Sequence, residues 1–218
     1  MTVLPQVASR PYPWPFDGPW STADTVLLCL AVQNDPVAEC GADDLVVRLA
    51  AFVASWRDAG GIVIHGRRGY DPAVGLPAAV TWRTARRSRD RVLPMDDPGW
   101  EIAPAVAPRT GEPIVDHSGD NAFIGTDLAF LLARGPVRNL IVGGMRTETV
   151  VHATMRAAND QGFECLLLED GTATDLPGAK ETIFHITRFG NGLFGVTAPI
   201  AAVVAALGNR RTMEAAAE

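Results

Sequence analysis

The stretch Asn139–Asp170, NLIVGGMRTETVVHATMRAANDQGFECLLLED, decides the fold of this chain of 218 residues. It begins with the apolar run NLIVGG (139–144), shows helical spacing from Thr147 to Asp160, and ends in a second apolar run, ECLLLED (164–170). Short apolar runs on either side of a helical pattern predict a strand–helix–strand unit whose two strands are parallel and buried on both faces.

The same alternation continues in both directions along the chain. We expect further strands at residues 25–32, 61–66, 113–117 and 193–196, and helices at residues 45–56, 126–134, 178–189 and 197–207. Strands that alternate with helices predict an α/β fold, Rossmann-like, with three α/β/α layers and a mainly parallel sheet of about six strands. In such sheets ligands bind beyond the carboxyl ends of the strands.

The chain divides into three parts. Residues 1–22 are rich in proline and aromatic residues, which predicts an extended N-terminal arm whose aromatics bury against the domain or a neighbouring subunit. Residues 23–207 form a single domain, and we expect the tail, 208–218, to be frayed.

Composition excludes several classes of function. The net charge is −6 and no basic run exists, so nucleic acid and anionic membranes are not expected partners. No apolar stretch approaches the ~20 residues of a membrane span and no signal-peptide pattern is present, which predicts a cytoplasmic protein. The three cysteines and four histidines lack metal-site spacing, and no G-x-G-x-x-G follows the first strand. We therefore expect neither a metal nor a cofactor.

Five motifs carry a resemblance to a known family. They are YPWPFDG (12–18), PGWEIAPAVAP (98–108), GDNAF (119–123), GTDL (125–128) and the stretch at 139–170. Together they resemble the isochorismatase-like cysteine hydrolases, and within that family the biuret hydrolase group of amidohydrolases. The resemblance covers nearly the whole chain. It implies a homo-oligomer, a dimer or a tetramer, since the family generally assembles in this way.

The resemblance also implies where the Asp–Lys–Cys triad of these amidohydrolases should lie. The aspartate position, two residues before Gln33, is Ala31 in this chain; the lysine position is His117; the cysteine position, three residues after Thr147, is Val150. A valine cannot be a nucleophile and an alanine cannot exchange a proton. We therefore expect neither amide hydrolysis by the family's route nor isochorismatase activity, which needs the acidic residue.

Two hypotheses remain. The first is a repurposed enzyme in which His117, which titrates near neutrality, performs acid/base chemistry on a small anionic carbonyl or amide compound. The second is an inactive pseudoenzyme that binds a ligand or forms a hetero-oligomer with an active homologue. An open polar cavity containing His117 and Arg146 would favour the first, whereas Ala31 and Val150 packed shut would favour a structural role.

Ligand contacts are expected from the carboxyl ends of the strands and from the turn after residue 144. The candidates are Gln33, Arg67, Trp82, Phe123, Met145, Arg146, Thr149 and Val150. Arg67 and Arg146 would favour an anion near the positive end of a helix, with surface ion pairing as the alternative. Trp82 and Phe123 would line the mouth of a pocket, with simple packing as the alternative.

The neighbours of His117 follow from strand geometry. Side chains alternate along a strand, so Asp116 should point to the opposite face, and Asp120 is the better candidate for a neighbour. His65 lies inside an expected strand and is interpreted as a core histidine with a hydrogen-bond partner. Thr147 is expected to cap the following helix with its hydroxyl group.

Overall fold

The structure is a computed structural model and describes residues 3–78, 81 and 92–215. Its core is a sheet of seven strands, all of them paired in parallel. The strands are β1 (Thr25–Leu30), β2 (Ile62–Tyr70), β3 (Leu93–Pro94), β4 (Ile114–His117), β5 (Asn139–Met145), β6 (Glu164–Ala173) and β7 (Val196–Ala198). The predicted α/β class with a mainly parallel sheet is confirmed; the seventh strand is β3, only two residues long.

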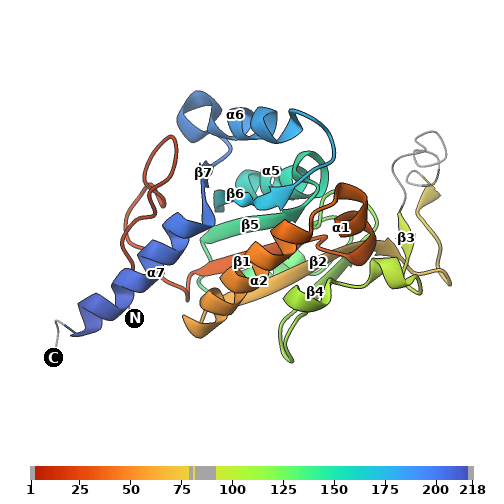
Figure 1. Ribbon diagram of the computed structural model, residues 1–218, viewed down its shortest axis with the longest axis horizontal. Helices are drawn as coiled ribbons and strands as arrows, with labels where there is room; N and C mark the ends of the chain where they lie inside the picture. Colours follow the sequence, from red (N-terminus) through yellow and green to blue (C-terminus); the bar gives the residue numbers. More distant parts are fainter. Residues whose placement is uncertain (1–2, 79–80, 82–91, 216–218) are drawn as a thin grey trace.

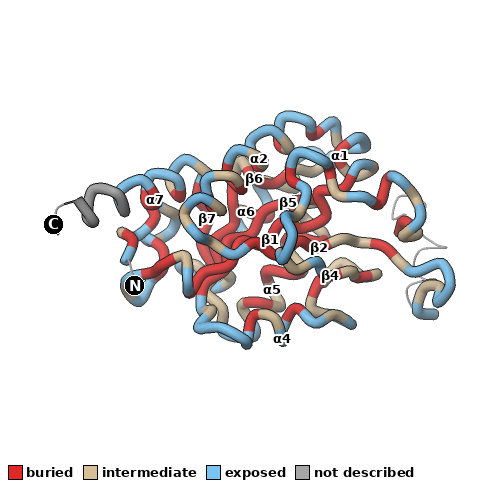
Figure 2. The backbone as a smooth tube through the Cα atoms, turned by 90° about the horizontal axis from the view of Figure 1, so that it is seen from below, coloured by how far each residue is buried: buried red, intermediate tan, exposed pale blue. Residues whose placement is uncertain are grey.

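Helices cover both faces of this sheet (Figures 1 and 2). The helices are α1 (Asn34–Cys40), α2 (Asp43–Asp58), α4 (Leu128–Ala133), α5 (His152–Asp160), α6 (Ala179–Gly192) and α7 (Ile200–Ala215), with short turns η1 (Pro98–Trp100), η2 (Pro104–Val106) and η3 (Thr147–Val151). Figure 2 shows α1 and α2 on one side of the sheet and α4 and α5 on the other, which is the expected three-layer arrangement.

The strand order places the carboxyl ends of β1 and β5 side by side near the centre of the sheet. The order is β3-β2-β1-β5-β6-β7, and β4 also pairs with β2. Every residue of β1 is buried, because helices cover the strand on both faces, as its continuous apolar sequence predicted. Since β1 lies between β2 and β5, the residues just beyond its end face those that follow β5. This is the place where parallel sheets bind ligands.

Two ends of elements differ from the sequence prediction. The last strand is Val196–Ala198 rather than residues 193–196. The closing helix α7 continues to Ala215, whereas the pattern had ended it at Leu207 and left 208–218 frayed. Residues 209–215 contain neither proline nor a further glycine, so the helix continues past Gly208 despite the cost of that residue.

The N-terminal arm lies against its own domain. Leu4 pairs with Trp20 and Val7 with Trp14 in antiparallel bridges, so the arm folds back on itself. Arg10 extends the sheet beside β7 through two hydrogen bonds of 2.9 Å with Thr197. Trp14 and Trp20 of the arm therefore bury against the domain, one of the two outcomes left open by the sequence, whereas Phe16 is exposed.

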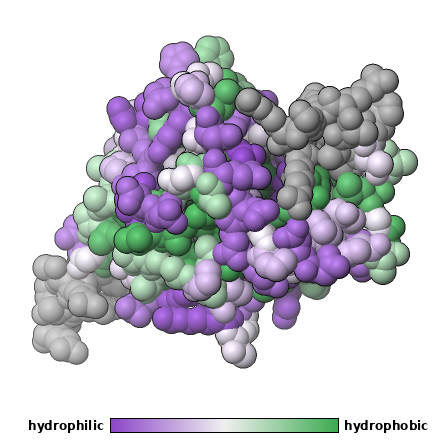
Figure 3. All heavy atoms as spheres, turned by 45° about the vertical axis from the view of Figure 1, so that its right-hand side comes forward, coloured by the Kyte–Doolittle hydropathy of each residue, from purple (hydrophilic) through white to green (hydrophobic). Residues whose placement is uncertain are grey.

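Hydrophilic residues predominate on the face seen in Figure 3, with hydrophobic ones interspersed among them. Within the described part of the chain, no helix combines the length and the apolar character that crossing a membrane requires.

A partly buried polar network connects β2 to α2. Arg57 donates two hydrogen bonds to Glu112, at 2.7 and 2.6 Å, and Nε2 of His65 lies 3.3 Å from the same carboxylate. Burial alone would raise the pKa of Glu112, but the hydrogen bonds from Arg57 and from the Arg109 amide lower it below its usual 4.5. Burial lowers the pKa of His65 from 6.5, despite its contact with Glu112. The interpretation of His65 as a partnered core histidine is confirmed.

This network predicts acid sensitivity in two steps. The fold favours neutral His65, so stability is complete above about pH 6.5 and falls as the pH drops below that value. The fold favours ionised Glu112, so its contribution is complete above about pH 4.5 and is lost as the pH falls through the lowered pKa. Glu112→Gln should cost about 2 kcal/mol at pH 7, because a charge-assisted bidentate pair is lost.

Urea unfolding at several pH values checks this prediction. The difference between Glu112→Gln and the wild type should shrink below about pH 4.5, where the wild-type carboxylate also becomes protonated. Glu101→Gln is the matched control, because that carboxylate is 61% exposed and its nearest contact with Arg67 is long, at 4.0 Å. Removing its charge should therefore change stability little. A constant difference at all pH values, or an equal loss in the control, would contradict the assignment.

Candidate functional site

The candidate site lies where β1 and β5 end. Ala31 follows β1 with a φ of 50°, and its amide donates to the Gly66 carbonyl at 2.8 Å. Val150 belongs to η3, the turn after β5. Ala31 and Val150 are 3% and 2% exposed and belong to the same apolar cluster. Two positions that are far apart in the sequence are thus brought together by the ends of adjacent strands.

A cavity of about 40 Å³ lies between these two residues. Its lining consists of Ala31, Gln33, Pro36, Arg68, Leu93, Met145, Arg146, Thr149 and Val150. Five of the eight expected contact residues are therefore in the lining. Ligand pockets in proteins usually measure roughly 300–1,000 Å³, whereas a buried water needs only about 10–15 Å³. The cavity has room for water-sized molecules rather than for an organic substrate.

His117 lies beside this cavity without lining it. The residue is 3% exposed, and Nε2 lies 3.5 Å from the point that a Cβ on Gly66 would occupy. Nδ1 is 2.7 Å from the Gly119 carbonyl, so Nδ1 carries the proton and Nε2 carries the lone pair. Among the described residues Nε2 has no hydrogen-bond partner.

Burial lowers the pKa of His117 below 6.5, and the cation of Arg68 acts in the same direction. The Gly119 carbonyl and the carboxylates of Asp120 and Asp116 oppose this shift without cancelling it. The ring is therefore neutral at pH 7. A neutral imidazole with a free Nε2 has the protonation state of a general base, but its burial separates it from any reactant.

The two acidic residues near His117, Asp116 and Asp120, lie on opposite sides of β4, as expected from the alternation of side chains along a strand. Asp116 points to the other face, where both of its oxygens bind Arg67 at 2.7 and 2.9 Å. Arg67 also lies over the Trp100 ring, 3.6 Å from its centroid. Asp120 lies on the same side as His117 and pairs with Arg68 at 3.1 Å. Arg68, rather than the expected Arg67, is thus the arginine of β2 that reaches the cavity.

Gln33 and Arg146 line the cavity with side chains that already have partners. The Gln33 amide group donates to the Trp100 and Arg68 carbonyls, at 2.7 and 3.2 Å, and its oxygen accepts from the Arg68 amide at 2.8 Å. Arg146 contacts Glu39 at 2.6 Å, Asp175 at 2.9 Å and the Cys40 sulfur at 3.4 Å. Two carboxylates next to Arg146 reduce its attraction for a further anion.

The turn itself differs from the predicted helix start. Residues 147–151 form one π-helical turn, and α5 begins at His152. No side chain caps this turn; the Thr147 hydroxyl donates instead to the Ala173 carbonyl at 3.1 Å. The prediction that Thr147 caps the helix is therefore wrong, because the hydroxyl holds the turn against the end of β6.

Two expected contact residues, Phe123 and Trp82, are not among the described residues that line the cavity. Phe123 packs at the edge of the apolar cluster on the α4–α5 side and is absent from the cavity lining. Trp82 lies outside the described residues. No group of three or more His, Cys, Asp or Glu side chains within the described ranges is arranged to hold a metal ion.

Comparison with known proteins gives a consistent result. A family model described as "Isochorismatase domain" matches residues 25–190. The ureidoacrylate amidohydrolase RutB of Variovorax paradoxus is 26% identical over 164 residues, which cover 68% of this chain and 65% of that protein. A streptothricin hydrolase of Streptomyces noursei is 32% identical over 62% of this chain and 43% of its own length. The chain thus spans less than two thirds of these two relatives.

A solved structure shares the fold. The cysteine hydrolase from Pseudomonas syringae pv. phaseolicola superposes with a TM-score of 0.77 and 21% identity, covering 94% of this chain and 98% of that one.

Proposed function

Since the chain belongs to the isochorismatase family, we propose that it is a catalytically silent member whose role is that of a subunit in an oligomer. The observation that carries this proposal is the site itself, where the cavity lined by Ala31, Val150 and seven other residues measures about 40 Å³. Hydrolysis in the amidohydrolases that this chain resembles needs a thiolate, a base and a cation. The two residues at the base and thiolate positions supply only methyl groups.

The proposed oligomer is a dimer or tetramer of this chain, or a hetero-oligomer with an active homologue. Oligomers are usually symmetric, and an inactive subunit can complete an assembly without taking part in the chemistry. Size-exclusion chromatography with light scattering measures the mass of the purified protein. A monomer at all concentrations would remove the homo-oligomer from the proposal.

A second function is favoured by one specific observation, the free Nε2 of His117. An imidazole with an unpartnered lone pair beside the Arg68–Asp120 ion pair is a candidate acid/base group. In this alternative the chain acts on a small carbonyl or amide compound, and Arg68 and Arg146 favour an anionic one. The segment around His117 would first have to open.

Turnover measured by mass spectrometry separates the two functions. The wild type and His117→Ala would be incubated with a panel of ureido, amide, imide and enol-ether carboxylates. We expect no turnover by either protein, because the nucleophile and the family's acid are both replaced. Turnover by the wild type that disappears in His117→Ala would overturn the silent-subunit proposal and make His117 the acid/base residue.

A further inference from the structure

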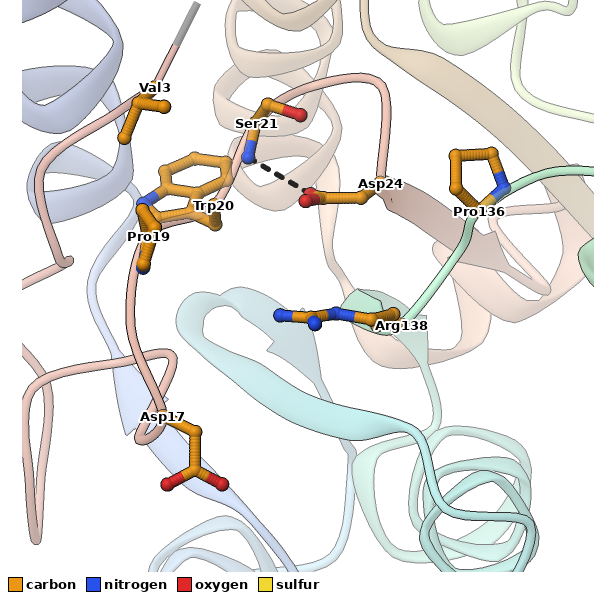
Figure 4. A pocket seen from close by; sticks show the side chains of 8 residues that line it. All are labelled: Val3, Asp17, Pro19, Trp20, Ser21, Asp24, Pro136 and Arg138. Carbon is orange, nitrogen blue, oxygen red and sulfur yellow. Dashed lines mark hydrogen bonds between the residues drawn. The ribbon is translucent and has the colours of Figure 1, made fainter. Parts of the chain in front are cut away.

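A second cavity, of about 420 Å³, lies at the opposite end of the sheet from the one beside Val150 (Figure 4). Its residues include Asp24 and Arg138, which directly precede β1 and β5. The volume is within the roughly 300–1,000 Å³ of ligand pockets, which the first cavity does not approach. By size alone, the amino-terminal end of the sheet is the better place for a small organic molecule.

The wall of this pocket is mainly apolar and held in place by backbone contacts. Val3, Pro19 and Trp20 come from the N-terminal arm, and Pro136 comes from the loop before β5. The Trp20 carbonyl accepts from the Leu4 amide at 2.8 Å, and the indole N–H of Trp20 donates to the Pro5 carbonyl at 2.7 Å. The pocket is therefore formed before any ligand arrives, which lowers the cost of binding.

Arg138 gives the pocket a cation that the protein does not use. Its amide donates to the Asp24 carbonyl at 2.9 Å, which fixes the backbone beside the pocket. Arg138 is exposed, and across the described residues its guanidinium has neither a hydrogen bond nor an ion pair; it lowers the pKa of Glu164 only through its charge. Arg57 and Arg146, by contrast, each have a carboxylate oxygen at 2.6 Å.

Asp24 and Asp17 give the same pocket two carboxylates. Asp24 is 8% exposed, and its Oδ1 accepts from the Ser21 amide at 2.9 Å and from the Thr25 hydroxyl at 3.0 Å. The other Asp24 oxygen receives no hydrogen bond from the residues that the structure describes. Asp17 lies exposed on the rim. Figure 4 shows Arg138 and Asp24 bordering the same space below Ser21 and Trp20.

We propose that this pocket binds a small zwitterion of the amino-acid type. The ligand carboxylate takes the planar fork of Arg138, which matches a carboxylate in geometry and charge. The ligand ammonium lies toward Asp24, which borders the same space as Arg138 (Figure 4). An apolar side chain covers the wall formed by Pro19, Trp20 and neighbouring residues. Arg138, Asp24 and Asp17 form no ion pair among the described residues, and a cation and a carboxylate bordering one mainly apolar pocket fit such a ligand better than a simple anion.

Isothermal titration calorimetry of the full chain tests this proposal with leucine, methionine and phenylalanine. At least one should bind with a millimolar or lower dissociation constant, and Arg138→Gln should weaken that binding about tenfold or more, since a charge-assisted bidentate contact is lost. Arg134→Gln is the matched control, because it removes an equal charge from an exposed position outside the pocket.

Isocaproate and isoamylamine, which lack the ammonium and the carboxylate of leucine respectively, test the ligand class. Both should bind more weakly than leucine. Absence of saturable binding by all three amino acids at millimolar concentration would overturn the proposal, as would equal affinity in Arg138→Gln and the wild type. Isocaproate binding as tightly as leucine would overturn the zwitterion assignment. An unchanged urea midpoint for Arg138→Gln shows that any loss of binding is local.

Discussion

Gly144→Ala is expected to destabilise the protein by roughly 2–6 kcal/mol, since strain and steric overlap each cost about 1–3 kcal/mol. Gly144 has a backbone φ of 130°, a value that L-amino acids other than glycine rarely adopt. A Cβ at this position would overlap the Leu30 carbonyl oxygen and lie 2.7 Å from the Leu30 nitrogen. Both atoms belong to the backbone of β1, so no side-chain rotation can relieve the overlap.

Equilibrium unfolding in urea measures this effect, and Gly162→Ala is its matched control. Gly162 also has a positive φ, 86°, but nothing lies within 4 Å of the point that a Cβ on this residue would occupy. The control should therefore lose only the backbone cost, about 1–2 kcal/mol. If the two variants lose equal stability, the close approach of β1 and β5 is not what requires glycine at position 144.

This close approach also shapes the candidate site. Gly144 contacts Leu30, and the residues that follow them, Met145 and Ala31, both line the small cavity. The two strand ends are thus held at backbone contact, and the side chains beyond them have little space. Small residues at the strand ends let the backbones approach, and the apolar Val150 closes the space from the turn. The size of the cavity follows from this packing.

The sequence predicted the sheet because its signals are local. Short apolar runs such as TVLLCL (25–30) favour strands buried on both faces because they are too short for a typical helix, and their alternation with amphipathic helices leaves few other topologies. Strand ends then place Ala31 near the turn containing Val150. The volume between them depends on side-chain packing from four separate segments, and no local pattern encodes it.

The two arginines of β2 can be told apart from the sequence. Side chains alternate along a strand, so Ile64, Gly66 and Arg68 share the face that carries the cavity, while Arg67 faces Trp100. Counting from the apolar Ile64 would have selected Arg68. The partners of Arg146 could not be found in this way, because Glu39 and Asp175 are distant in sequence and meet it only in the folded chain.

Trp20→Ala is expected to destabilise the protein strongly, because Trp20 anchors the N-terminal arm in the core. Trp20 is 1% exposed; its ring lies 6.2 Å from that of Trp56 in a stacked arrangement and 5.3 Å from that of Trp14. Truncation would remove these contacts and the hydrogen bond to Pro5. Replacing a buried aromatic residue with alanine typically costs about 3–5 kcal/mol, because the apolar transfer energy is lost and a cavity remains.

Phe16→Ala is the control within the same arm, since Phe16 is 59% exposed and should change stability by less than about 1 kcal/mol. The double variant Trp20→Ala/Trp56→Ala gives the coupling between arm and helix α2, expected at about 0.5–1.5 kcal/mol for a stacked pair. If Trp20→Ala costs no more than Phe16→Ala, the arm is held by its backbone bridges alone. A large loss of stability in Trp20→Ala, together with a measurable coupling energy to Trp56, would instead mean that Trp20 belongs to the core of its own domain. The same packing would hold Trp20 in place as a wall of the pocket beside Arg138.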